Sequence, residues 1–299
     1  MVNVMKDLSL PSGHGVTIPA EAVLALRSHP QFPVAMRQSA QSAIALHRGG
    51  GLLGWLMGDR ARAIFSYVII YLDATHDPRD PRSGVTASRV KETCSELGLC
   101  SPNRAAAMLA LMRSARFVAS VEDVEDARVR RLAPTEKLRS LQNARITGQL
   151  GALALLDAQA AEALRRLDDP AFETRIVLGL ADYFFGGVRI LQHSPELTLF
   201  AERSAGMVIL LHLLLDPGAP DRPIDLSIAQ LSRRFGVSRV HIIRLLRDAE
   251  AQGLASRVGS RGEALMLSPE CVGAAENMVA TMFALFRIAA TKALETAGS

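Results

Sequence analysis

The sequence has few of the side chains from which catalytic and metal sites are built. Its 299 residues include only 3 Cys, 7 His, 3 Tyr and 1 Trp. The histidines are scattered and show neither the HxxxH nor the HxH spacing of a metal site. There is no nucleophile elbow, no phosphate-binding loop between a strand and a helix, and no paired carboxylate arrangement. These absences predict a protein that is not an enzyme and that carries no metal ion and no cofactor.

Long apolar runs and a cysteine pairing pattern are missing as well. The longest apolar runs, residues 65–72 and 205–215, are too short to span a bilayer and are expected to form buried helices. The first fifteen residues lack the apolar core of a secretory signal. Three cysteines without a pairing pattern suit a reducing compartment. We therefore expect a cytoplasmic protein with no membrane partner.

Alanine and leucine are abundant, while aromatic residues make up only 5% of the chain, which favours a mostly helical fold. The formal net charge of +4 is too small to indicate a nucleic-acid partner by itself. Its distribution is more informative, because the stretch from Arg203 to Arg261 contains nine Arg and only five acidic residues. The surplus in this stretch equals the net charge of the whole chain, which indicates a local basic surface.

Residues 226–267 combine this charge with a recognisable pattern of elements. Apolar residues recur at helical spacing in two short segments, which are separated by a Gly-Val-Ser tripeptide at 236–238. The glycine can end the first helix in a left-handed conformation, and the serine can cap the second helix. Two alternating runs, 255–258 and 264–267, then predict a β-hairpin. Helix, turn, helix and hairpin together resemble the winged helix-turn-helix, the DNA-reading module of many bacterial repressors.

A second helix-turn-helix is predicted in the first half of the chain. Thr86 is expected to cap its first helix, and Gly98 to make the turn. Ser101 is expected to cap its second helix, which has Pro102 in its first position. The strands of a hairpin are expected to follow at residues 117–121 and 129–132.

The segment between these strands resembles the wing of the MarR family of bacterial regulators. That family carries an Asp, an Arg two residues later and a Thr nine residues after the Asp. Asp126, Arg128 and Thr135 stand at these positions here. The resemblance implies that Asp126 orients the wing and that Arg128 enters the minor groove of DNA. The sequence departs from the family at Ala127, where a second Arg is common, and at Leu138, where Gly is usual.

The two halves of the chain repeat one order of expected elements: two helices, a buried helix ending in Asp, a loop, a helix-turn-helix, a wing and a long helix. MarR-like proteins are homodimers, so the resemblance implies a fused pseudo-dimer with pseudo-two-fold symmetry that is a monomer in solution. We expect a mainly α fold of tandem winged helix-turn-helix modules joined by long helices. The expected units are a flexible N-terminus, residues 1–18, and two repeats, residues 19–157 and 158–299. Further helices are expected at residues 19–29, 32–47, 59–73, 134–156, 157–167, 172–193, 195–215 and 269–294.

In a winged helix the second helix of the motif enters the major groove, where Arg pairs with guanine and Asn with adenine. In the first module the candidate DNA contacts are Ser101, Pro102, Asn103, Arg104, Ala107 and Arg128. In the second module they are Arg233, Ser238, Arg239, Val240, His241, Arg244, Arg257 and Arg261. Within this set, Ser238 and Arg233 suit phosphates. The alternative interpretation is a solvated helix face.

Two further features have alternative interpretations. Trp55, Tyr183, Phe184 and Phe185 are candidates for the pocket of a small-molecule effector, and the alternative is core packing. Cys100 stands just before the second helix of the first motif, where a helix dipole can lower the pKa of a thiol. The alternatives for Cys100 are a redox switch and a small buried thiol.

The sequence thus predicts a sequence-specific transcriptional regulator that binds double-stranded DNA. Plasmid replication initiators also carry two winged modules in one chain, so a protein of replication or plasmid maintenance is the first alternative. A winged-helix protein-interaction module that does not bind DNA is the second.

Overall fold

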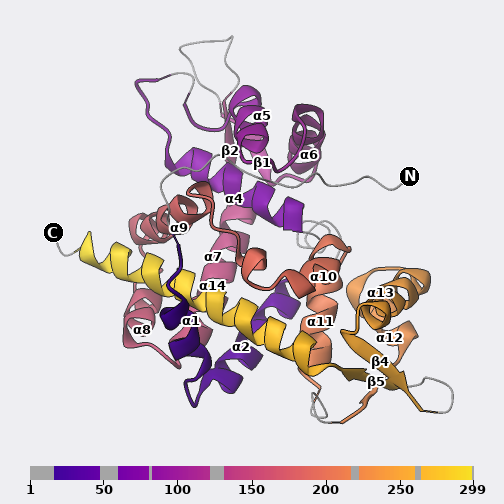
Figure 1. The fold of residues 1–299 in the computed structure, drawn as a ribbon. Helices are drawn as coiled ribbons and strands as arrows, with labels where there is room; N and C mark the ends of the chain where they lie inside the picture. The colour runs from indigo at the N-terminus through magenta and orange to yellow at the C-terminus, as the bar shows by residue number, and fades with distance from the viewer. Residues whose placement is uncertain are drawn as a thin grey trace.

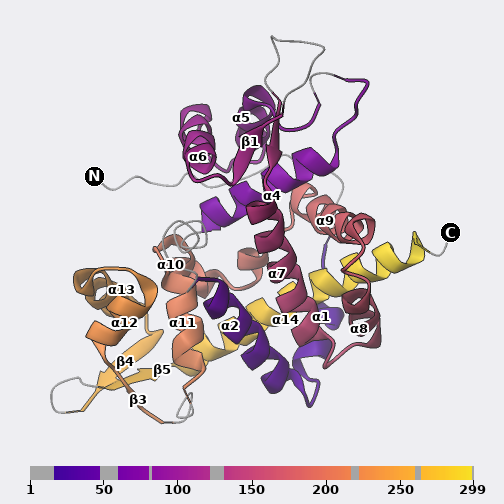
Figure 2. The ribbon, with the colours of Figure 1, turned by 180° about the vertical axis from the view of Figure 1, so that it is seen from behind.

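The computed structural model describes residues 17–47, 60–80, 83–121, 131–216, 222–259 and 264–297. Helices dominate these residues, and the strands form two small antiparallel sheets. The prediction of a mainly helical fold is therefore confirmed. Figure 1 shows the long helix α14 (Pro269–Glu295) crossing the molecule in front of α7 (Glu136–Leu153), and Figure 2 shows the same crossing from behind.

The chain forms a similar succession of elements twice. Before residue 157 the elements are α1 (Ala20–Arg27), α2 (Phe32–His47), α4 (Arg60–Ala74), α5 (Ala87–Glu96), α6 (Pro102–Ser114), β1 (Val118–Ser120), β2 (Leu132–Pro134) and α7. After it they are α8 (Ala158–Arg165), α9 (Pro170–Phe185), the short turns η1 (Ile190–His193) and η2 (Pro195–Leu197), α10 (Thr198–Glu202), α11 (Gly206–Leu214), β3 (Ile224–Asp225), α12 (Ile228–Phe235), α13 (Arg239–Ala251), β4 (Ala255–Val258), β5 (Ala264–Leu267) and α14. Helix lengths correspond as well, since α1 and α8 have 8 residues, α2 and α9 have 16, and α6 and α13 have 13.

Each half has a hairpin whose second strand also bonds to a segment before the helix-turn-helix. β1 pairs with β2, and β4 pairs with β5, both antiparallel. On the other edge of β5 lies β3, and at the equivalent place in the first half Val85 forms an isolated bridge to Leu132. The sequence does not predict β3, because a two-residue strand is set by its pairing partner and not by its own pattern.

The two halves pack on each other reciprocally. α1 of the first half contacts α14 of the second, and α8 of the second half contacts α7 of the first. In the same way α2 packs against α11, and α9 packs against α4. Within each half, the equivalent pairs α2–α7 and α9–α14 make the most extensive contacts between helices. The apolar core is therefore shared, and Ala40 and Ile44 of α2 belong to the core of the second half.

Small residues allow the two principal helix crossings to be close. A Cβ added to Gly148 of α7 would lie 2.8 Å from the Cβ of Ser42 on α2. A Cβ added to Gly179 of α9 would lie 3.3 Å from the Cα of Ala289 on α14. Both distances are shorter than ordinary van der Waals contact, so each crossing depends on its glycine. A glycine thus has the same role at equivalent crossings in the two halves.

The region between α9 and α11 differs from the prediction, which has two continuous helices at residues 172–193 and 195–215. After α9, Gly187 takes a φ of 97°, a conformation that favours glycine. α11 begins after Ala205, which has a φ of 57°. At Gly206 an added Cβ would lie 2.3 Å from the carbonyl oxygen of Phe200, so the turn requires glycine there. The prediction was wrong here because the apolar periodicity continues through the breaks, while backbone turns set the helix ends.

By length and composition alone, α14 could cross a membrane. The pair Pro195–Glu202 and Gly206–Leu214, bent by 117°, would pass the same test if it were one span. Half of the apolar window of α14 is buried inside the molecule. α14 packs against α1, α8 and α9. A helix in the core of a protein can have the same length and apolar composition as a membrane-spanning helix.

Candidate nucleic-acid interface

The helix-turn-helix of the second half is built by local signals that the sequence predicts. Ser227 caps α12, because its hydroxyl accepts a hydrogen bond from the N–H of Gln230 at 3.3 Å. Gly236 has a φ of 65° and ends α12 in the left-handed conformation. Ser238 then caps α13 by accepting from the N–H of His241 at 3.1 Å. The helices, the turn and the hairpin that follows lie where they are predicted.

One face of α13 is exposed and basic. Arg239, Arg244 and Arg247 are exposed, and Val240 beside them is 55% exposed. Arg233 is exposed on the last turn of α12. The opposite face of α13 packs into the core through Ile242, Leu245, Leu246 and Ala249. The helix therefore presents its arginines to solvent on a rigidly packed scaffold.

The acidic residues on and next to α13 are neutralised by ion pairs. Asp248 lies 2.6 Å from the guanidinium of Arg203, and Glu250 lies 3.3 Å from that of Arg257. Four other arginines form no ion pair and no hydrogen bond with any residue that the structure describes: Arg233, Arg239, Arg244 and Arg247. Their charge is thus concentrated on one surface with no local acid to compensate it.

Two of the expected DNA contacts in this half are engaged elsewhere. The ring Nε2 of His241 lies 2.9 Å from the carbonyl oxygen of Ser204, so His241 docks α13 onto the turn before α11. Arg257 pairs with Glu250, and its backbone N–H also donates to that carboxylate at 2.9 Å. Both side chains therefore have a partner within the fold, and their contact with DNA stays a prediction. Ser238 and Val240 remain on the exposed surface with the four arginines.

The first half has the same construction with less charge. Thr86 caps α5 by accepting from the N–H of Arg89 at 3.2 Å, as predicted. Ser101 caps α6 by accepting from the N–H of Arg104 at 3.4 Å, and Pro102 is the first residue of the helix. The exposed face of α6 carries Asn103, Arg104, Ala106, Ala107, Ala110, Leu111 and Arg113. Beyond its first turn this face is mostly small and apolar, unlike that of α13.

Thr135, the Thr of the MarR-like wing pattern, has a defined place in the fold. Its hydroxyl lies 2.8 Å from the carbonyl oxygen of Arg116 and 3.1 Å from that of Phe117. These contacts tie the start of α7 to the end of α6. The other expected wing residues, together with one expected pocket residue, lie outside the described residues: Asp126, Arg128, Arg261 and Trp55.

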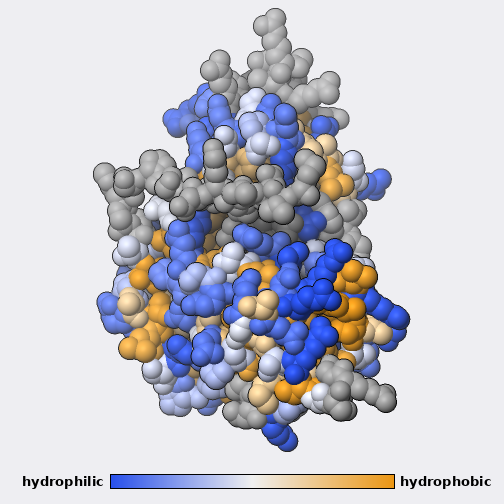
Figure 3. Space-filling view, turned by 45° about the vertical axis from the view of Figure 1, so that its right-hand side comes forward, coloured by the Kyte–Doolittle hydropathy of each residue, from blue (hydrophilic) through white to orange (hydrophobic). Residues whose placement is uncertain are grey.

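α6 and α13 lie on the same side of the molecule, on the right in Figure 1 and on the left in Figure 2. Figure 3 turns this side toward the viewer and shows strongly hydrophilic side chains interspersed with hydrophobic ones over its lower part.

The predicted effector residues Tyr183, Phe184 and Phe185 lie in the packing between helices. The ring of Phe185 packs on that of Tyr71 from α4, with centroids 4.3 Å apart, and Phe184 meets Phe185 edge-on at 6.1 Å. Arg189 covers the ring of Phe184 at 4.1 Å. All three aromatic residues are partly buried against the shared core. This arrangement favours the alternative interpretation, core packing.

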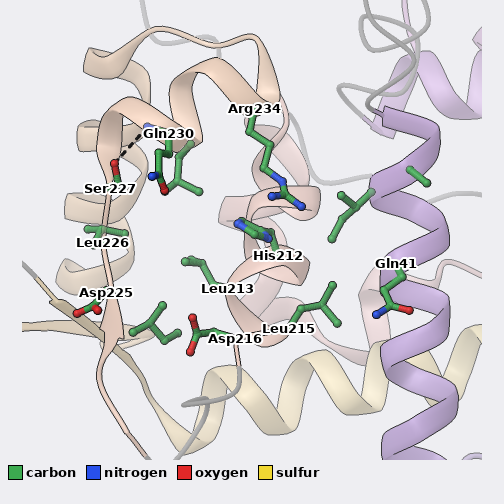
Figure 4. Close-up of a pocket in the computed structure, with 14 residues that line it drawn as sticks. Gln41, His212, Leu213, Leu215, Asp216, Asp225, Leu226, Ser227, Gln230 and Arg234 are labelled. Carbon is green, nitrogen blue, oxygen red and sulfur yellow. Dashed lines mark hydrogen bonds between the residues drawn. The ribbon is translucent and has the colours of Figure 1, made fainter.

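A cavity of about 540 Å³ lies elsewhere, between α2, α11 and α12. Figure 4 shows Arg234 of α12 pointing into it, His212 of α11 near its middle and Gln41 of α2 at its side. Asp216 and Asp225 lie at the other end. Sequence spacing gives no signal for this cavity, because its walls come from opposite ends of the chain.

The same junction holds the turn of the α12–α13 unit. His47, the last residue of α2, is buried, and its Nε2 lies 3.3 Å from the carbonyl oxygen of Phe235. The rings of His47 and His212 pack on Phe235 with centroid distances of 5.7 and 5.5 Å. A residue of the first half thus contacts the helix-turn-helix of the second, directly before its turn.

Comparisons with models of protein families, with curated proteins and with solved structures find no match for this chain. Within the part of the chain that the structure describes, no group of three or more His, Cys, Asp or Glu is positioned to hold a metal ion. The function is therefore inferred from the basic face of α13 and from the pairing of two similar units.

Proposed function

We propose that this protein is a sequence-specific transcriptional regulator that binds double-stranded DNA through two winged helix-turn-helix modules. The observation that carries the proposal is the exposed face of α13, where Arg239, Arg244 and Arg247 have no acidic partner among the described residues. These arginines follow the serine cap on one helix. Guanidinium groups can bond bidentately to phosphates and to guanine edges. A merely solvated face would carry compensating acids, and the two acids nearby are already paired.

The two modules, residues 19–157 and 158–299, are proposed to form a fused, MarR-like pseudo-dimer with pseudo-two-fold symmetry. The support is the repeated order of elements and the reciprocal packing of α1 on α14 and of α8 on α7. A symmetric homodimer of half-chains would make each such contact twice. With α6 and α13 on one side of the molecule, the two helices are expected to enter major grooves about one helical turn apart.

The modules are expected to contribute unequally. Arg239 stands directly after the cap of α13 and can reach base edges, while Arg233 on α12 suits a phosphate. In α6, Asn103 suits adenine and Arg104 suits guanine, with fewer charges around them. Most of the salt-dependent affinity is therefore assigned to the α12–α13 unit.

A second candidate, a winged-helix module that binds protein, is favoured by one observation. The exposed face of α6 carries Ala106, Ala107, Ala110 and Leu111, which suit packing against another protein better than contact with phosphates. In that case DNA affinity would depend on α13 and not on α6.

The test is selection of bound duplexes from a random pool, followed by affinity measurement between about 50 and 200 mM salt. We expect the double variant Arg239→Ala, Arg244→Ala to weaken binding to the selected site at least about tenfold, because each base contact contributes roughly 1–3 kcal/mol. Arg165→Ala is the matched control and should leave binding unchanged, since this exposed arginine of α8 pairs with Glu162.

A wild-type chain that enriches no sequence, or a double variant that binds as tightly as wild type, would contradict DNA binding through α13. Binding that survives replacement of both Asn103 and Arg104 by Ala would assign DNA to α13 alone and leave α6 for a protein partner. Selected sites located at promoters support transcriptional regulation, whereas sites at a replication origin support the replication or maintenance role.

A further inference from the structure

Two of the three cysteines meet at the turn of the first helix-turn-helix. Cys94 of α5 is fully buried, and Cys100 is partly exposed directly before Ser101, the cap of α6. Between them Gly98 has a φ of 61°, its N–H donates to the carbonyl of Ser95 at 3.0 Å, and the next N–H donates to the carbonyl of Cys94 at 2.9 Å. This pair of bonds is the Schellman ending of a helix, which folds the chain back over its last turn. Cys100 directly follows the residue whose N–H bonds to Cys94, and each thiol influences the pKa of the other.

The two thiols interact, and their surroundings make them unequal. Burial, with a smaller contribution from the nearby Cys100, raises the pKa of the Cys94 thiol to about 12. Burial also raises the pKa of Cys100, but the neighbouring Cys94 thiol and the charge of Arg104 oppose that rise. Cys100 is therefore the more exposed of the two thiols and the one that more easily becomes a thiolate. Cys94 stays protonated and buried.

The corresponding turn of the second half has no thiols and is closed differently. There Ser232 occupies the place of Cys94, since its carbonyl accepts the N–H of Val237 just as that of Cys94 accepts the N–H of Leu99. The hydroxyl of Ser232 donates across the turn to the carbonyl oxygen of Val237 at 2.7 Å. An ordinary hydrogen bond thus closes one turn, and a thiol pair lies across the other.

We infer that Cys94 and Cys100 form a reversible intramolecular disulfide, a redox-sensitive modification site in the turn that positions α6. The oxidant is a hydroperoxide. The thiolate of Cys100 attacks the peroxide, so that an S–O bond forms, the O–O bond breaks, and the leaving hydroxide takes up the proton that Cys100 lost. Cys94 then attacks the sulfenic sulfur of Cys100, an S–S bond forms, the S–O bond breaks, and hydroxide leaves with the proton of Cys94. For hydrogen peroxide, two thiols and one peroxide give one disulfide and two waters.

The disulfide changes the start of α6. An S–S bond is about 2.05 Å long, shorter than any contact between two unbonded sulfur atoms, so Cys100 must move toward α5 when it forms. Ser101 follows Cys100 directly, and its capping bond to the N–H of Arg104 is already long at 3.4 Å. Oxidation therefore displaces the first turn of α6, with Asn103 and Arg104. That this regulates DNA contact rests on the proposed function.

The first measurement is independent of DNA. The full-length chain is treated with one equivalent of hydrogen peroxide, alkylated and digested with trypsin, which releases both cysteines on one peptide, residues 92–104. We expect that peptide to lose two hydrogen atoms, to resist alkylation, and to recover on reduction with dithiothreitol. Cys271→Ala should behave like wild type, and Cys100→Ser should abolish the change. A peptide with added oxygen at Cys100 and an alkylated Cys94, or a cross-link between two chains, would overturn the inference.

The second measurement is a footprint of the reduced and oxidised chain on a selected DNA site. We expect oxidation to remove protection of the half-site at α6, to spare the half-site at α13, and to have no effect in Cys100→Ser. A disulfide that leaves the footprint unchanged would overturn the link to α6. A reduced chain that protects no DNA would overturn the proposed function and leave the disulfide standing.

Discussion

At the scale of single residues, the exposed arginines of the second half differ in what they can reach. Arg239 is the first residue of α13, while Arg233 lies on the helix before the turn. Arg239→Ala should cost roughly 1–3 kcal/mol on the selected site and relax the preference at one base pair. Arg233→Ala should weaken binding to every sequence alike and reduce the salt slope by about one unit. Salt titrations on selected and scrambled duplexes measure both. Equal losses on both duplexes for Arg239→Ala would make this residue a phosphate contact.

A buried thiol gives a second prediction at this scale. Burial raises the pKa of Cys271 from an ordinary 9.0 to about 12, so the folded chain keeps a proton that the unfolded chain loses first. The resulting stabilisation is complete below pH 9 and is lost as the pH rises from 9 toward 12. Above pH 9 the free energy of unfolding should fall more steeply in wild type than in Cys271→Ala, by up to about 1.4 kcal/mol per pH unit. Denaturant unfolding at several pH values measures this, and parallel curves would show that the thiol does not titrate in this way.

Which residues carry the site could be predicted from the sequence only where the signal was local. Arg239 and Arg244 follow a serine cap at fixed positions of one helix, so spacing alone puts them on its exposed face. His241 satisfies the same spacing on α13, and Arg257 lies on the hairpin strand β4, but the two side chains bond to Ser204 and Glu250. Those partners are brought there by packing, which a pattern of residue types does not record.

At the scale of elements, the crossing of α7 with α2 gives a test of packing. Gly148→Ala would place a Cβ 2.8 Å from that of Ser42, and overpacking of this kind costs about 1–3 kcal/mol. Removing a glycine from a helix returns only about 0.5–1 kcal/mol, so a net loss of stability of about 1–2 kcal/mol is expected. Gly273→Ala in α14 is the control, since its Cβ would meet the flexible end of Arg27 at 3.5 Å and should be neutral or stabilising. Urea unfolding compares the two, and equal stabilities would show that the α2–α7 crossing can relax.

Element boundaries were predictable where turn chemistry is explicit. Gly236 and Ser238 fix the end of α12 and the start of α13 through their own backbone and side-chain preferences. Between α9 and α11 the apolar period continues, and the breaks depend on close backbone approaches such as that of Gly206 to Phe200. A two-residue strand such as β3 exists only through its partner β5. Contacts of that kind cannot be predicted from the pattern of neighbouring residues in the sequence.

At the scale of the whole molecule, the packing bears on oligomeric state. In a dimer of separate half-chains, the short first helix of each half-chain would pack against the long last helix of its partner. Here α1 packs against α14 of the same chain, and Val23 and Leu26 of α1 are buried. An ion pair of 2.7 Å joins Arg27 of α1 to Glu276 of α14. In the same way α8 packs against α7. Among the described residues, the exposed large apolar side chains come from five separate segments: Leu24, Val34, Leu111, Leu155 and Val240.

We therefore expect a monomer in dilute solution, because the surfaces that would join two half-chains are already filled. Light scattering coupled to gel filtration should give the mass of one chain, 32.2 kDa, across micromolar concentrations. The complex with a complete DNA site should exceed the mass of the DNA alone by the mass of a single chain. A variant that breaks the α1–α14 contact, Leu26→Asp, is the informative comparison. It buries a charge at this junction and should expose the apolar face of α14, so it is expected to lose stability and to self-associate. A wild-type chain that is a dimer at every concentration, or that occupies a single DNA site as two copies, would show that the two halves do not complete each other.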